Sequence, residues 1–305
     1  KIALGAAVAT KRMTLKARDT LLKNMTEEVA DLVLVDNRLQ TQAITIAQGQ
    51  GVALLEPASQ LMTQLESEKF LNRAVECLPD SKQLAELRST KQGLSRPEIA
   101  VLLAYAKMSF FRDLVESPLL DAPYFEADLL RYFPKAMAKD FAGDIRAHRL
   151  RREIVATMIT NSIVNRTGFA MAASLMRATG LSAADVAQAY ITTRDAFGLR
   201  TLWKEIEALD GIVPTSVQSQ LFVAVNQFIE HSCRWFLQHV PQPMAMDDVM
   251  ARYMPAIAEI EKHADAMMSD SVRSAFAASM ERLVAQRVPE PIARRMAMLE
   301  IMTRS

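Results

Sequence analysis

Glycine, cysteine and aromatic residues are all scarce in this chain of 305 residues. It holds 9 glycines and 2 cysteines, and aromatic residues make up 6 % of it. Sheet-rich folds favour aromatic and β-branched residues, so this composition argues against a β-sandwich or an α/β sheet. The two cysteines, Cys77 and Cys233, are isolated in sequence. They exclude a disulfide-rich scaffold and indicate a reducing, cytoplasmic setting.

The chain also lacks a large excess of charge and any long apolar run. Its formal net charge is +1, which argues against a strongly basic nucleic-acid surface and against an acidic disordered tail. No apolar run approaches the roughly 18 residues that a membrane span needs, and no secretory signal is visible at the start. We therefore expect no nucleic acid and no membrane among its partners. Because the first residue is Lys1, we expect a fragment or a processed product.

Helix signals run along most of the chain. Half of its residues are hydrophobic, which is enough for a sizeable core. Ser95 and Glu98 form a capping box, the pattern that starts many helices, and apolar residues follow on one helical face. Another helix is predicted from residue 61 through residue 75. The sequence thus predicts an all-α protein, an irregular multi-helix bundle of one or two helical subdomains.

Residues 148–168 carry the most informative pattern. Arginines crowd the first half, and at about 100° per residue the second half is apolar on opposite sides of a helix. A helix of that kind is buried. Asn161 and Asn165 share the side of Ile154, so we expect each to find a hydrogen-bond partner, because an unpaired buried amide costs about 1–3 kcal/mol.

The same stretch resembles the C-terminal helical region of the large NAD-dependent glutamate dehydrogenases of bacteria. Four more segments carry the resemblance in the expected order: residues 32–43 (LVLVDN with QTQA), 96–107 (RPEIA with LLAYAK), 132–134 (YFP) and 202–214 (LW, IEALD and VP). The match covers roughly residues 20 to 260. Arg38 departs from the family, which has an aromatic residue there, and Ser95 stands where threonine is commoner. The resemblance implies a parent enzyme that oxidatively deaminates L-glutamate to 2-oxoglutarate and ammonia with NAD.

The resemblance and the composition together predict three parts. Residues 1–60 are expected to be a helical junction with a catalytic domain, and to expose apolar surface when that domain is absent. Residues 61–240 would be the first part of a helical C-terminal domain, and residues 244–305 a further helical subdomain. Pro241 and Pro243 mark the clearest linker between these last two parts.

Arg149 and Arg152 belong to a basic cluster that spreads around the predicted helix. Arg149 and Glu153 are four residues apart, so we expect them to pair. Three interpretations stay open: ion pairs that position the helix, a docking surface for the catalytic core or a sister subunit, and contact with an anionic ligand or nucleic acid. No aromatic residues are interleaved as base stacking would require, which weakens the last.

Motifs for catalysis or cofactor binding are weak. Gly49 and Gly51 resemble the start of a dinucleotide loop, but Leu54 occupies the position of the third glycine. We therefore expect NAD to bind upstream of Lys1. The four histidines lie outside any Cys/His cluster, so no metal is expected. Lys107 sits at the edge of an apolar stripe. We expect its aliphatic stem to lie on the apolar surface with its ammonium group in water, in preference to a role as a catalytic base.

We expect a non-catalytic region of the enzyme, with a structural, oligomerisation or regulatory role. Its expected partners are the catalytic domain of the same chain and further copies of the protein. The candidate structural or interface residues are Arg149, Arg152, Glu153, Asn161 and Asn165. The alternative is a free-standing helical protein-interaction module whose resemblance to the family is only architectural.

Overall fold

The computed structural model describes residues 2–241 and 245–304. Within these ranges the chain is helical almost throughout and no residue is assigned to a strand, which confirms the predicted all-α fold. The helices in chain order are α1 (Ile2–Ala9), α2 (Leu15–Asn24), α3 (Thr26–Gln50), α4 (Leu55–Ser67), α5 (Ser81–Ser89), α6 (Arg96–Val115), α7 (Glu126–Arg131), α8 (Lys135–Asp140), α9 (Ala142–Arg146), α10 (Arg151–Thr167), α11 (Met171–Thr179), α12 (Ala183–Ala196), α13 (Leu199–Glu207), α14 (Thr215–His239), α15 (Met246–Met267), α16 (Asp270–Ala285) and α17 (Glu290–Arg304). Short 3₁₀ helices are η1 (Gly51–Leu54), η2 (Pro118–Asp121) and η3 (Pro123–Phe125).

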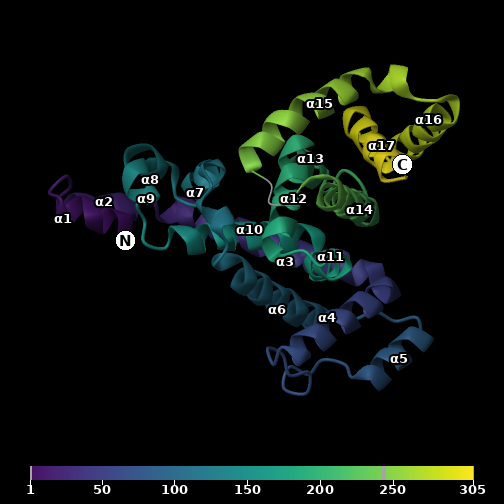
Figure 1. The fold of residues 1–305 in the computed structure, drawn as a ribbon, viewed down its shortest axis with the longest axis horizontal. Helices are drawn as coiled ribbons and strands as arrows, with labels where there is room; N and C mark the ends of the chain where they lie inside the picture. The colour runs from purple at the N-terminus through teal and green to yellow at the C-terminus, as the bar shows by residue number, and fades with distance from the viewer. Residues whose placement is uncertain (1, 242–244, 305) are drawn as a thin grey trace.

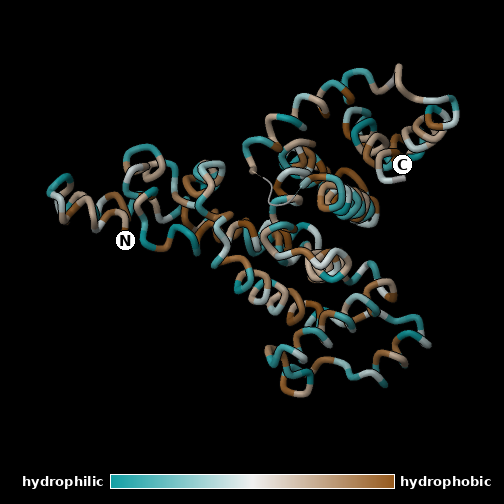
Figure 2. Tube along the Cα trace, in the orientation of Figure 1, coloured by the Kyte–Doolittle hydropathy of each residue, from teal (hydrophilic) through white to brown (hydrophobic). Residues whose placement is uncertain are grey.

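Three groups of helices extend from a common centre (Figure 1). α1, α2 and α7–α9 form a lobe near the N-terminus, α4–α6 form a second arm, and α15–α17 lie at the far end with the C-terminus. α3 and α10 run through the centre. Hydrophobic and hydrophilic stretches alternate along most helices in Figure 2, as expected for helices with one buried face.

α10 is the central helix of this arrangement. It packs against α3, α6, α7, α11, α12 and α14. Its buried residues lie on several sides, and include Ile154, Val155, Ile159 and Ile163. This confirms the buried helix that the sequence predicts. Gly168, with φ of +85°, ends it at the predicted place.

α6 begins as its sequence requires. The backbone N–H of Ser95 donates to the Glu98 carboxylate at 2.6 Å, which completes the predicted capping box. Ile99, Leu102 and Leu103 then enter the core. They belong to a buried cluster that α6 shares with α4 and with the last turns of α3. The capping box and the apolar face both favour a helix here, and α6 packs stably against α10.

The predicted helix from 61 through 75 is wrong in its second half. α4 ends at Ser67, and Lys69 has φ of +56°, which breaks the helical path. Phe70 leaves the helix to pack edge-on against Tyr105 of α6, with ring centroids 5.9 Å apart. The Arg73 side chain turns back to Glu66 at 2.8 Å. Tertiary contacts of the aromatic ring therefore outweigh local helix propensity.

Two further expectations meet the limits of the described residues. Gln242 and Pro243, between the second and third predicted parts, lie outside them, and the division into three parts stays a prediction. Over the ranges that the structure describes, no helix is both long enough and apolar enough to cross a membrane.

Candidate functional site

Arg152 lies in the first turn of α10, where its side chain binds the C-terminal end of α6. Its Nη2 donates to the carbonyl oxygens of Val115 at 3.2 Å and Ser117 at 3.0 Å, and its Nη1 pairs with Asp121 of η2. Carbonyls at a helix C-terminus have no partner within the helix, and a guanidinium satisfies them while opposing the helix dipole. Arg152 therefore positions α10 against α6, which favours the first of the three interpretations.

The predicted pairing of Arg149 with Glu153 is not formed. α10 starts at Arg151, so Arg149 lies in the preceding turn and is exposed, while Glu153 is half-buried in the first turn. Among the described residues, neither Arg149 nor Glu153 forms an ion pair. The i, i+4 rule applies only inside a helix, and here the helix starts two positions after Arg149.

Asn161 and Asn165 differ in environment, although the sequence places both on one face. Asn165 is 3 % exposed, whereas Asn161 is only half-buried. No group of the described protein donates to Oδ1 of Asn165. This side chain lines a small cavity of about 30 Å³, which Asn226 and Gln50 also line. A cavity of that size, lined in part by polar side chains, has room for a water molecule, which can donate the hydrogen bond that the protein does not.

The cavity lies where α3, α10 and α14 meet, and ion pairs and hydrogen bonds from arginine side chains surround this junction. Nη1 of Arg166, in the last turn of α10, donates to Glu207 of α13 at 2.7 Å. The Glu207 carboxylate also pairs with Arg38 of α3 at 3.6 Å. On the other side, Arg96 at the start of α6 donates to Thr45 and Gln48 of α3 at 3.2 and 3.1 Å. The second half of α3 is thus held by α6, α10 and α13.

A groove of about 640 Å³ runs beside this junction, between the end of α3 and the first half of α14. Its walls are made of hydroxyl and amide side chains, such as Gln48, Gln220 and Ser219, together with a few small apolar residues. No titratable side chain is among its lining residues. Such a lining can donate and accept hydrogen bonds, but it supplies no general acid or base.

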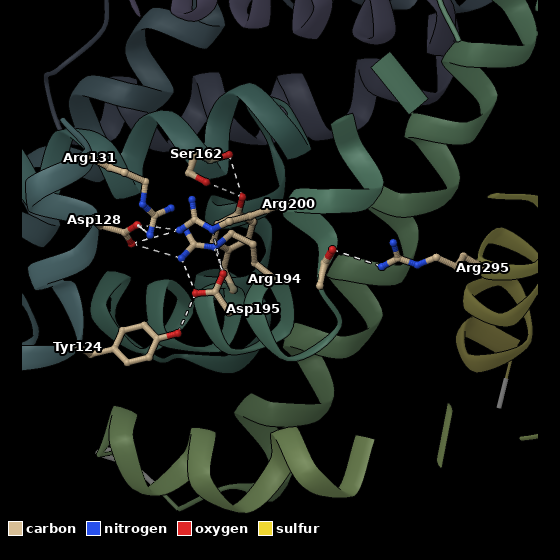
Figure 3. Close-up of polar contacts among 10 residues, drawn as sticks. Tyr124, Asp128, Arg131, Ser162, Arg194, Asp195, Arg200 and Arg295 are labelled. Atoms are coloured by element: carbon tan, nitrogen blue, oxygen red, sulfur yellow. Dashed lines mark hydrogen bonds and ion pairs between the residues drawn. The ribbon is translucent and has the colours of Figure 1, made fainter. Parts of the chain in front are cut away.

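The most heavily buried charges lie elsewhere, between α7, α12 and α13 (Figure 3). We call them the Asp128–Arg194 cluster, which consists of Tyr124, Asp128, Arg131, Arg194, Asp195 and Arg200. Arg194, only 2 % exposed, holds Asp195 through two hydrogen bonds of 2.6 and 2.7 Å. Arg200 spans both carboxylates, at 2.9 Å from Asp128 and 3.1 Å from Asp195.

Each carboxylate in the Asp128–Arg194 cluster is paired with at least two arginines. Burial alone would raise the pKa of Asp195, but hydrogen bonding and charge from Arg194, followed by the charge of Arg200, outweigh it and hold the pKa at about 2. Burial and then the charge of Asp195 raise the pKa of Tyr124, whose hydroxyl donates to Asp195 at 2.8 Å. These groups provide each other's hydrogen-bond and charge partners, so the cluster connects α7 to α12 and α13.

This cluster is the main feature that the sequence analysis missed. Asp128 and Arg194 are 66 positions apart, and no local spacing links them. The available signal was a charged Arg194–Asp195 pair within a helix whose other residues are largely apolar or small. Charges in such a helix are rarely buried without partners.

Burial shifts the pKa of two side chains that could serve in catalysis, Lys107 and Cys233. Burial lowers the pKa of Lys107, and the negative charge of Asp36 on α3 acts in the opposite direction. Burial raises the pKa of the Cys233 thiol to about 12, so it is protonated at neutral pH and a poor nucleophile. In the part of the chain that the structure describes, no three His, Cys, Asp or Glu side chains are grouped as a metal site requires. Gly51 ends α3 with φ of +56° and leads into η1, so its loop follows a helix and not a strand.

Comparison with known families gives two matches, one at each end of the chain, with residues 48–90 between them. A family model described as "Glutamate dehydrogenase, C-terminal" matches residues 91–305, and one described as "Bacterial NAD-glutamate dehydrogenase, catalytic domain" matches residues 1–47. The second match ends inside α3. α3 therefore begins in the catalytic-domain match and packs against helices of the C-terminal match, namely α6, α10 and α14.

The class that emerges is the helical end of a glutamate dehydrogenase. Three similar proteins are NAD-specific glutamate dehydrogenases: from Pseudomonas aeruginosa, 36 % identical over 297 residues; from Halomonas elongata, 34 % over 293; and from Mycobacterium tuberculosis, 32 % over 301. The matches cover 96–97 % of this chain and 18 % of each relative. Since the C-terminal model matches more than half of it, the chain belongs to the glutamate dehydrogenase family, as its resemblance implied.

Proposed function

We propose that this chain is the C-terminal region of an NAD-specific glutamate dehydrogenase and that it supports the catalytic domain without taking part in the reaction. The whole enzyme would oxidise L-glutamate with NAD to 2-oxoglutarate and ammonia. The nicotinamide cofactor and the reacting residues would lie in the part of the polypeptide outside this chain. The family match and the names of the three relatives support the activity of the whole enzyme.

One observation carries the supporting role. α3 starts in the match to the catalytic domain and its second half is fixed by helices of the C-terminal match. Buried Ala43, Ile46 and Ala47 supply apolar contact, while Glu207 and Arg96 add the polar links. α3 contains no proline, and a helix without a kink of that kind curves only gently, so a position fixed in its second half also constrains its first half. The C-terminal helices would therefore set where the last helix of the catalytic domain lies.

Oligomerisation and localisation belong to the same proposal. Arg152 is used inside the chain, whereas Arg149 and its exposed turn are free to meet a sister subunit. We propose a homo-oligomer in the cytoplasm. The two unpaired cysteines, one exposed and one buried, support a reducing compartment.

The test compares the purified chain with the full-length enzyme. Residues 1–305 alone should form no NADH from glutamate and NAD, while the full-length enzyme does so under the same conditions. In the full-length enzyme, Arg166→Met should lower the temperature at which activity is lost and leave the KM for glutamate and for NAD unchanged, because it loosens the junction and touches no ligand.

Arg88→Met is the matched control, since Arg88 pairs with Glu56 at 2.9 Å on a surface where both side chains are more than half exposed. It should change neither heat resistance nor kinetics. Turnover by residues 1–305 would disprove the proposal, and so would a rise in the KM for NAD caused by Arg166→Met at unchanged heat resistance.

A further inference from the structure

The first half of α3 is exposed on every side. Each residue from Val29 to Arg38 is exposed, although the stretch contains four consecutive apolar residues, Leu32 to Val35. Val33 and Leu34 are 62 % and 61 % exposed. Isolated exposed apolar residues are ordinary on a protein surface, but a continuous run of them on one helix marks a contact surface.

These residues cover the whole circumference of the helix. At about 100° per residue, four consecutive positions are distributed around the full circle. Leu34 lies nine positions after Met25 and nine before Ala43, which places it about 180° from both. Met25 and Ala43 are buried against the rest of the chain. Leu34 therefore lies opposite the buried side of α3 that Met25 and Ala43 mark, and Val33 and Val35 flank it on either side.

The exposed stretch is anchored at both ends, so it is no frayed terminus. On one side Met25 is buried, and Glu28 accepts a hydrogen bond from the backbone N–H of Lys135 at 2.9 Å. On the other side Ala43, Ile46 and Ala47 are buried against α6 and α10. Valine is a poor helix former, and helices in proteins depend mainly on tertiary packing. The stretch therefore needs packing that the described residues do not give it.

We infer that residues 29–37 form an interior helix of the catalytic domain, enclosed by the part of that domain that lies outside this chain. This inference rests on the proposed function. The catalytic-domain match covers residues 1–47 and so includes the whole stretch, and the relatives extend far beyond this chain, which spans 18 % of their length. The four apolar residues Leu32 to Val35 face all sides of the helix, between the polar Asp31, Asp36 and Asn37. Apolar side chains on every side call for an enclosing interior more than for a flat interface.

A second copy of this chain fits the stretch less well. A two-fold contact uses one self-complementary patch, which covers one side of a helix. The apolar surface to be covered here spans a wide arc of the helix circumference, from Val33 through Leu34 to Val35. Asp31 lies on the same outward side, about 60° from Leu34, and it is exposed here. The enclosing segment must therefore supply a hydrogen-bond donor or a cation opposite Asp31.

Thiol labelling of the full-length enzyme, compared with residues 1–305, tests this enclosure. Single cysteines replace Val33, Leu34 or Val35 in the full-length enzyme and in residues 1–305, each in a Cys77→Ser background because Cys77 is the exposed native thiol. A maleimide should label all three quickly in residues 1–305. In the full-length enzyme each should react at least about a hundredfold more slowly, because labelling requires a local opening. Val75→Cys is the control: Val75 is 72 % exposed, in the segment between α4 and α5 and outside the catalytic-domain match, so it should label equally fast in both proteins.

Each other outcome overturns the inference. Equal labelling of the three cysteines in both proteins means that nothing covers α3. Protection of Leu34→Cys alone means a flat contact on one side. Protection in residues 1–305 that disappears on dilution means a second copy. A failure of the proposed function would look different, since turnover by residues 1–305 is measured without any of these variants.

Discussion

Arg166 of α10 and Glu207 at the end of α13 form a hydrogen-bonded ion pair, with Nη1 and Oε1 2.7 Å apart. Both side chains are largely buried. The guanidinium also lies over the ring of Trp203, 4.6 Å from its centroid. Because Glu207 reaches Arg38 of α3 as well, this one carboxylate links α13 to both the central helix and the helix in which the catalytic-domain match ends.

Arg166→Met in residues 1–305 should lower the free energy of unfolding by about 1–3 kcal/mol, since it leaves the Glu207 carboxylate buried with only the exposed Arg38. The double variant Arg166→Met/Glu207→Leu should recover part of that loss, because it removes the uncompensated charge as well. Urea unfolding followed by circular dichroism measures both. Additive losses in the double variant would mean that the two side chains do not interact.

Arg152 and Arg149, both in the basic cluster that the sequence shows, should differ in their contribution to stability. Arg152→Met should cost about 1 kcal/mol, because the carbonyls of Val115 and Ser117 lose their donor at the end of α6. Arg149→Met should stay within about 0.5 kcal/mol of the wild type, since Arg149 is exposed and outside the helix. The midpoints of urea unfolding compare the two. A larger loss for Arg149→Met would contradict the assignment of Arg152 as the positioning residue.

Local signals predicted the helices whose local and tertiary preferences agree. The Ser95–Glu98 box starts α6, and the apolar pattern of residues 154–164 marks α10 as buried. Residues 70–75 show the opposite case: their helical spacing is real, but Phe70 gains more by packing on Tyr105 and under the guanidinium of Arg112. Sequence periodicity does not reveal contacts of that kind, because the partners are far away in the chain.

The polar features of the interior were harder to predict for the same reason. Asn165 is buried as expected, but the expected partner for its Oδ1 is absent from the described protein groups. Asn161, on the same helical face, is half-buried, because burial depends on which neighbours cover each turn. Arg38, a departure from the family pattern, finds Glu207 across 169 positions. The exposed apolar surface expected within residues 1–60 does occur on α3.

Two neighbouring threonines of α12 give a matched pair for testing buried hydroxyls. Thr192 and Thr193 are both fully buried. Thr193 donates to Ser232 of α14 at 3.1 Å, whereas the Thr192 hydroxyl has no partner in the described protein. Thr193→Val should therefore cost about 1–2 kcal/mol, and Thr192→Val should be neutral or stabilising, since valine has the same shape without the unsatisfied oxygen.

Thermal unfolding of the two valine variants, with the double variant to test additivity, measures this difference. The reverse order, with Thr192→Val the more damaging, would mean that the Thr192 hydroxyl has a partner that the protein groups do not provide, such as a buried water.

The Asp128–Arg194 cluster should make stability fall in acid. Asp195 has a pKa of about 2 in the folded chain, against 3.8 for the ordinary side chain. A carboxyl group whose pKa is depressed on folding stabilises the protein above its unfolded pKa, and that contribution is lost as pH falls through the folded pKa. Between about pH 4 and pH 2 the chain should therefore lose roughly 2 kcal/mol through this one group.

Asp195→Asn isolates that contribution. The variant should be less stable than the wild type at neutral pH, because Arg194 stays buried without its closest carboxylate. Its stability should also fall less steeply between about pH 4 and pH 2, since the group that takes up the proton is gone. Asp19→Asn, at a side chain 63 % exposed in its pair with Arg18, should keep the slope of the wild type. Urea unfolding midpoints across this pH range decide the matter: parallel curves for the wild type and Asp195→Asn would mean that Asp195 does not carry the acid sensitivity.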